Sequence, residues 1–117
     1  MYKRQLDKGA VVTRPGWTAL HYAAAAGDEE IVRLLLEHHA YIDAESPSQI
    51  TPLMIAAREG QDGAVKVLLQ EGADATLKNN ERLTAAQIAV RAGKNDIAEA
   101  INAHLATRRA TAPPSRP

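Results

Sequence analysis

Apolar positions along the chain follow helical spacing and repeat at a fixed interval. A first pattern, rich in alanine, begins after a threonine and ends at a glycine. A second pattern places large apolar residues three and four apart, as in Ile31, Leu34 and Leu35, which is the spacing of one buried helix face. The threonines, the glycines and a central alanine recur 33 residues apart: Thr18, Thr51 and Thr84; Gly27, Gly60 and Gly93; Ala23, Ala56 and Ala89. This self-similarity predicts a repeat protein.

Each unit predicts two short helices and a polar connector. A threonine hydroxyl can accept a hydrogen bond from the free amides of the first helix, and the glycine can take the left-handed conformation that ends it. We expect second helices at residues 28–38, 62–71 and 95–105, capped by Asp28, Asp62 and Asn95. Turn-rich connectors follow at 43–49 and 74–82. Valine, isoleucine and aromatic residues are sparse, so the sequence predicts an all-α fold.

These residues in register resemble the ankyrin repeat. The first unit reads G-x-T-x-L-H-x-A-A-x-x-G and then E-I-V-x-L-L-L, and the likeness spans roughly residues 9–105. The resemblance implies an ankyrin-repeat solenoid of paired antiparallel helices with short β-hairpin or loop fingers. It places repeats at 16–48 and 49–81 and a C-terminal capping repeat at 82–106, where polar residues suit a solvated outer face.

The two ends of the chain depart from the repeat. Residues 1–15 include a stretch, residues 5–10, that resembles the end of a second helix whose own first helix is missing. This stretch is either a remnant of a longer array or a natural N-terminal cap. Residues 107–117 are rich in Pro, Ser and Arg without apolar periodicity, so we expect a disordered tail there.

Three positions lack the glycine that the resemblance leads one to expect. Gly16 stands two residues before the first threonine, but Gln49 and Arg82 occupy the equivalent positions. We therefore expect strained or differently shaped turns at these two residues. His39 replaces the glycine that ends the second helix.

Composition excludes several classes of function. The 117 residues carry 14 basic and 14 acidic side chains, and this balance disfavours a dedicated nucleic-acid binder. The chain has no cysteine, so a disulfide framework, a thiolate metal site and a cysteine nucleophile are all impossible. No run of 18 apolar residues predicts insertion into a membrane. Without a recognisable signal peptide the compartment stays open, with the cytoplasm slightly favoured.

No set of residues is spaced for catalysis or for holding a metal or cofactor. His38 and His39 are adjacent, so on a helix they point about 100° apart and do not readily share a metal ion. The resemblance gives His21 a structural role, in which the ring bridges the start of a helix to neighbouring backbone. We expect no enzyme activity, no cofactor, no metal and no small-molecule substrate.

The resemblance implies that a protein partner docks along the fingers and first helices. The residues it places on that groove are Arg14, Trp17, Tyr22, Ile50, Ile55, Arg58, Glu59, Leu83 and Arg91. Trp17, Ile50 and Leu83 share one position before each threonine, and they either form an exposed ladder or pack together to join the fingers. Likewise, the two arginines, Arg58 and Arg91, either meet an acidic partner or pair with Glu59 and its neighbours.

The function expected from these features is that of a monomeric, non-catalytic interaction module that scaffolds, regulates or inhibits a protein. The alternative is a regulatory or targeting fragment of a larger ankyrin-containing protein, such as an enzyme or a secreted bacterial effector. Whether the encoded protein continues upstream would separate the two.

Overall fold

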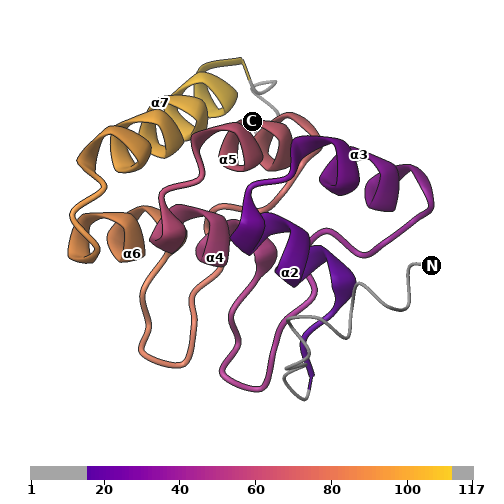
Figure 1. Cartoon of the computed structure of the whole chain (residues 1–117). Coiled ribbons are helices and arrows are strands. Elements are labelled where there is room, and N and C mark those ends of the chain that lie inside the picture. Colours follow the sequence, from indigo (N-terminus) through magenta and orange to yellow (C-terminus); the bar gives the residue numbers. More distant parts are fainter. Residues whose placement is uncertain (1–15, 112–117) are drawn as a thin grey trace, which may run out of the picture.

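The fold is a stack of antiparallel helix pairs. A computed structural model describes residues 16–111, with side chains described up to residue 107. Its helices are α2 (Ala19–Ala26), α3 (Glu29–Glu37), α4 (Pro52–Glu59), α5 (Asp62–Gln70), α6 (Ala85–Arg91) and α7 (Asn95–Thr111). The first helices α2, α4 and α6 form one row and the second helices α3, α5 and α7 form the other (Figure 1). The described range contains no strand, and the predicted all-α solenoid is confirmed.

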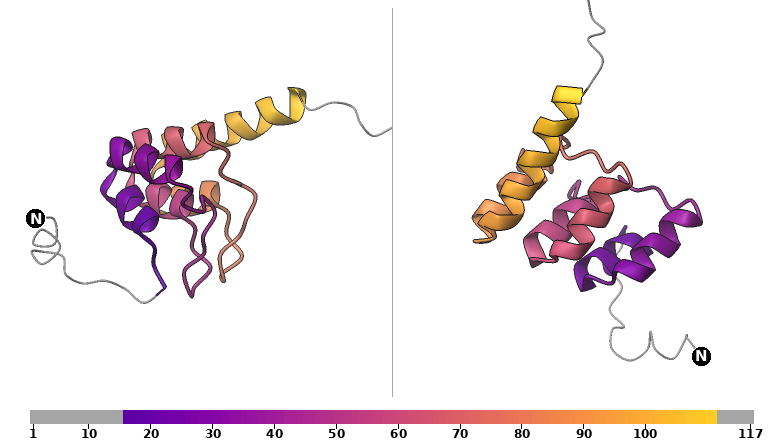
Figure 2. Two further views of the ribbon diagram at one scale, coloured as in Figure 1. Left: turned by 90° about the vertical axis from the view of Figure 1, so that its right-hand side faces the viewer. Right: turned by 90° about the horizontal axis from the view of Figure 1, so that it is seen from above.

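Loops between the helix pairs project as fingers on the side of the first helices, as Figure 2 shows from the side. We define the second finger as residues 43–50 and the third finger as residues 76–83. In each, a backbone amide donates to the carbonyl four residues on: Ser46 to Ile50 and Asn79 to Leu83, both at 3.0 Å. The fingers are therefore hairpins too short to form strands.

The threonine before each first helix caps it as predicted. Thr18, Thr51 and Thr84 have extended backbone, and each side chain accepts a hydrogen bond from the amide three residues later. This bond satisfies one of the free amides at the helix start. At the other end, Gly27 and Gly60 take a left-handed φ of 75°. Sequence and structure therefore agree on how these helices begin and how the first two end.

Two second helices begin differently from the prediction. Asp28 does cap α3, accepting from the amide of Ile31 at 3.1 Å. In the next unit, however, Gln61 holds the cap position and Asp62 is already helical. The Gln61 side chain donates from Nε2 to the carbonyl of Ala25 at 2.8 Å, so it ties two units together instead of capping its own helix. Asn95 is likewise the first residue of α7 and not its cap.

The last helix is longer than predicted. α7 continues to Thr111, so the boundary expected at residue 106 is wrong, as is the disorder expected for residues 107–111. The added turn contains alanine and arginine, which favour helix, and the first proline comes only at Pro113. Residues 1–15 and 112–117 lie outside the described range, and the predictions for them remain predictions.

Alanines allow neighbouring first helices to pack closely. Ala23, Ala56 and Ala89 are 7%, 0% and 0% exposed, and α4 packs between α2 and α6. Larger side chains such as Leu53 and Leu68 are fully buried in the same core cluster. A small residue at a helix contact lets two axes come near the short end of the usual spacing, about 8 Å. The alanine-rich pattern therefore belongs to the stacking interface.

Three residues with a Cβ adopt the left-handed conformation. His39, Gln49 and Arg82 have φ of 68°, 63° and 65°. Each Cβ is crowded in this region, so the strain expected at Gln49 and Arg82 is present. The geometry of the repeat is kept where its usual residue is not.

Candidate protein-binding groove

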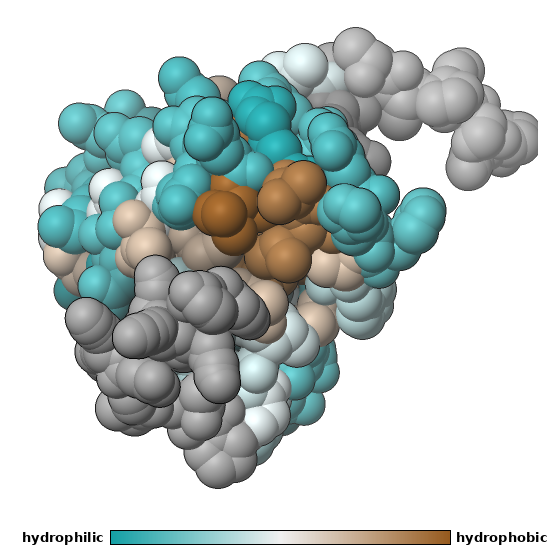
Figure 3. Space-filling model, turned by 45° about the vertical axis from the view of Figure 1, so that its right-hand side comes forward, coloured by the Kyte–Doolittle hydropathy of each residue, from teal (hydrophilic) through white to brown (hydrophobic). Residues whose placement is uncertain are grey.

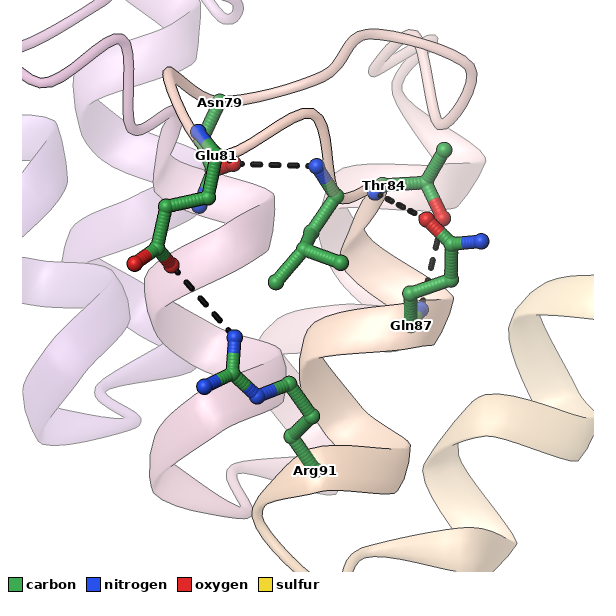
Figure 4. Close-up of polar contacts among 6 residues, drawn as sticks. Asn79, Glu81, Thr84, Gln87 and Arg91 are labelled. Atoms are coloured by element: carbon green, nitrogen blue, oxygen red, sulfur yellow. Dashed lines mark hydrogen bonds and ion pairs between the residues drawn. The ribbon is translucent and has the colours of Figure 1, made fainter.

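A cavity of about 330 Å³ lies where the first helices α4 and α6 meet the second and third fingers. Its lining residues are Ile50, Met54, Ile55, Arg58, Asn79, Glu81, Leu83, Ile88, Arg91 and Ala92. Ile55 and Ile88 are only 1% and 8% exposed, so they form an apolar base. Charged side chains stand higher up: in Figure 4, Arg91 extends from α6 toward Glu81 of the third finger. The cavity is therefore apolar below and charged at its rim.

Each finger is folded around one buried polar side chain. In the third finger, Asn79 Oδ1 accepts from the amides of Glu81 at 2.8 Å and Leu83 at 3.0 Å (Figure 4). In the second finger, Ser46 Oγ accepts from the amide of Ile50 at 3.2 Å. These bonds fix where Ile50 and Leu83 leave the fingers, and so they position the apolar wall of the cavity.

Sequence reasoning missed these two finger residues. Ser46 and Asn79 are 5% and 7% exposed, and they stand 33 residues apart, four before Ile50 and Leu83. Serine and asparagine commonly bond nearby backbone amides in turns. That recurrence of turn-forming polar residues at the repeat interval was the available signal.

His21 joins α2 to the second finger. Its ring is buried, with Nε2 2.7 Å from the carbonyl oxygen of Ile50 and Nδ1 3.0 Å from the backbone nitrogen of Thr18. An amide can only donate, so Nδ1 accepts and Nε2 carries the proton of a neutral ring. Burial lowers the pKa of His21 below its ordinary value, although hydrogen bonds to the backbone of Ile50 and Ala44 oppose the shift. The structural role predicted for this histidine is confirmed.

The capped helix pairs, the fingers and the bridging histidine recur together in one arrangement. A family model described as "Ankyrin repeats (3 copies)" matches residues 2–79 and also residues 43–108. The two matches overlap and together span most of the chain. The chain belongs to the ankyrin-repeat family. Ankyrin repeats are generally protein–protein interaction modules, and their domains are typically non-catalytic.

In this ankyrin stack, two members of the predicted ladder share the cavity and the third lies elsewhere. Ile50 and Leu83 are half-buried, pack against the core and line the cavity. Trp17 is also half-buried, with its ring centroid 5.3 Å from that of His21 and 5.2 Å from that of Tyr22. It is not among the cavity residues. The packing and ladder alternatives therefore both hold for Ile50 and Leu83.

Among the other predicted groove residues of the ankyrin chain, Ile55, Arg58 and Arg91 also line the cavity. Tyr22 is half-buried beside Trp17, and Glu59 is exposed next to the cavity residue Arg58. Ile55 is the base of the groove and not an exposed contact, because its side chain is almost fully buried. Arg14 lies outside the described residues.

Two ion pairs border the ankyrin groove. Arg58 Nε lies 3.2 Å from Glu59 Oε2, and Arg91 Nη1 lies 3.5 Å from Glu81 Oε1. The side chains are 45% and 44% exposed in the first pair, and 64% each in the second. Exposed pairs of this kind contribute about 0–1 kcal/mol, so the arginines can exchange their partners for those of a bound protein at small cost.

The described residues 16–111 were also searched for other chemistry. They contain no group of three or more His, Cys, Asp or Glu side chains placed to hold a metal ion. None of the helices in that part of the chain is long and apolar enough to cross a membrane.

Proposed function

We propose that this ankyrin-repeat chain binds a protein partner in the groove between its fingers and first helices, and that it thereby scaffolds, regulates or inhibits that partner. The cavity between α4, α6 and the two fingers is the observation that carries the proposal. Ile50, Ile55 and Leu83 supply its apolar surface, and Arg58 and Arg91 supply its charged rim.

Burial of apolar surface provides the affinity in this proposal. A partner side chain such as leucine, methionine or phenylalanine entering the cavity would remove its own surface and that of the base from water, at about 25 cal/mol per Å². Arginine at the rim can bond a carboxylate through two N–H groups, which fixes the orientation of the partner. We therefore expect a segment with a large apolar residue and an acidic residue close by.

Rigidity of the stack favours this binding. The finger amides are already bonded to Ser46 and Asn79, so the fingers need little ordering when the partner arrives. Ordering costs of about 0.5–1.5 kcal/mol for each immobilised side chain are avoided to that extent.

Photocrosslinking from the groove tests the proposal. The chain has no cysteine, so a single Glu81→Cys substitution can carry a photoreactive group at the cavity rim. The matched control is Lys66→Cys, which places the same group on an exposed position of α5. The protein crosslinked from the first position and not from the second is then purified, and its affinity for the unmodified chain is measured by calorimetry.

Charge reversal then decides whether the groove is the binding site. We expect Arg58→Glu with Arg91→Glu to weaken the affinity at least about tenfold, which is about 1.4 kcal/mol, and Lys66→Glu to change it less than about twofold. Far-UV circular dichroism checks that all variants keep their helices. If the double groove variant bound as tightly as the parent chain, the site would have to lie on another face.

A further inference from the structure

Helix α3 presents two large apolar side chains to solvent. Ile31 and Leu34 are 41% and 47% exposed, and they lie three residues apart on one face of the helix. On the side of the molecule toward α3, Figure 3 shows an apolar patch surrounded by polar surface. A helix of a folded repeat normally buries such a stripe against a neighbour.

The equivalent positions of the next unit are covered. Ala64 and Val67 stand 33 residues after Ile31 and Leu34, and they are 0% and 1% exposed. α5 packs against α4, α7 and α3, whereas α3 packs against α2 and α5. The difference between the two helices is a second helix on the preceding side. Ile31 and Leu34 are therefore the positions that such a helix would cover.

We propose that the segment at residues 1–12 covers this face, acting as the last turns of a preceding second helix with Leu6 at its centre. The segment precedes the described residues, and its assignment rests on the register of the sequence. Leu6 stands four residues before Ala10, as Leu36 stands four before Ala40. Leu36 is half-buried against the core, so the matching side chain is one that packs.

Charge complementarity favours this occupant over a second copy of the chain. Residues 1–12 carry three basic side chains and one acidic one, whereas α3 carries three acidic and one basic: Lys3, Arg4, Lys8 and Asp7 against Glu29, Glu30, Glu37 and Arg33. All four charged side chains of α3 are exposed. Two α3 helices brought together would instead set like charges against each other, and such pairs are unfavourable.

The connection is long enough for the segment to reach α3. Eight residue steps separate Ala10 from Thr18, and an extended chain of that length spans up to about 26 Å. Packed helices are about 8–10 Å apart, so the route can include a turn.

Thiol reactivity on the whole chain tests the proposal. A Leu34→Cys variant introduces the sole thiol at the apolar face, and Arg33→Cys introduces one at an exposed position next to it as the matched control. Rates of reaction with a chromogenic disulfide reagent are each divided by the rate in urea, which removes intrinsic differences. Each variant is measured with and without a second change, Leu6→Asp, and circular dichroism checks the helices.

We expect the L34C thiol to react at least about tenfold more slowly than the R33C thiol, because it is reached only when the segment opens. Leu6→Asp should remove most of that difference. Equal rates for the two thiols would overturn the proposal. Protection of L34C that ignored Leu6→Asp would overturn it too: protection that grew with protein concentration would assign the face to a second copy, and constant protection would assign it to another part of the chain.

Discussion

Replacing His39 by glycine should stabilise the protein, because the end of α3 requires a conformation that histidine resists. The amides of His39 and Ala40 donate to the carbonyls of Leu36 and Leu35, both at 3.0 Å, with His39 at φ 68°. This pair of bonds is the common glycine-based ending of a helix. α5 ends in the same way, but with Gly72 at φ 101°.

The magnitude follows from two opposing contributions. A residue with a Cβ in the left-handed region costs about 1–2 kcal/mol relative to its preferred conformation. Glycine gives back about 0.4–1 kcal/mol, because the unfolded chain gains freedom. His39 is exposed, so loss of its ring forfeits little burial. We expect His39→Gly to raise the free energy of unfolding by about 0.5–1 kcal/mol, which corresponds to about 3–6 °C in Tm.

Urea unfolding followed by circular dichroism measures this change, and Gly72→Ala is the reciprocal variant. A Cβ built at Gly72 has no heavy atom within 4 Å, so any loss there comes from the backbone and not from a clash. We expect that loss to match the gain at His39 within about 0.5 kcal/mol. If Gly72→Ala were neutral, or His39→Gly destabilising, the backbone explanation would be refuted.

Three further effects should be measurable by the same unfolding method. Because burial lowers the pKa of His21 from 6.5, the unfolded state binds a proton that the folded state refuses, so stability should fall as the pH drops below about 6.5, by up to about 1.4 kcal/mol per pH unit; His21→Gln should flatten this slope. Asn79→Ala should cost about 1–3 kcal/mol, because the amides of Glu81 and Leu83 lose their acceptor. A comparable result for Asn80→Ala, whose side chain is exposed, would argue against this account. Gln61→Ala should cost about 1 kcal/mol through loss of the bond to Ala25, and an unchanged stability would show that this tie between units has no net value.

The helices could be predicted because their signals are local and recur. Thr18, Thr51 and Thr84 cap three helices in the same way, so one correct interpretation at one threonine gave all three. Strain at Gln49 and Arg82 was predictable for a similar reason, since Gly16 marked the conformation that the position requires. A rule repeated at a fixed interval is checked by the sequence itself.

What could not be predicted depends on contacts between units. Gln61 leaves its own helix uncapped because its amide reaches the carbonyl of Ala25, a residue 36 positions earlier. The sequence placed Ile55 in the groove, but its near-complete burial follows from how α4 sits in the stack. Trp17 shares a sequence position with Ile50 and Leu83 yet packs beside His21 and Tyr22 and not in the cavity. Equivalent position therefore did not mean equivalent surroundings at the first unit.

The bridge from His21 gives the two fingers unequal stiffness. The second finger is anchored to α2 through the carbonyl of Ile50, while Met54 occupies the equivalent place below the third finger. A thioether has no N–H to offer the carbonyl of Leu83. The third finger instead leans on the second at its tip, where the amide of Asn80 donates to the carbonyl of Ser48 at 3.1 Å. The wall of the groove therefore acts as a lever with one fixed support, so a ligand that strains the third finger would transmit load back through His21 to α2.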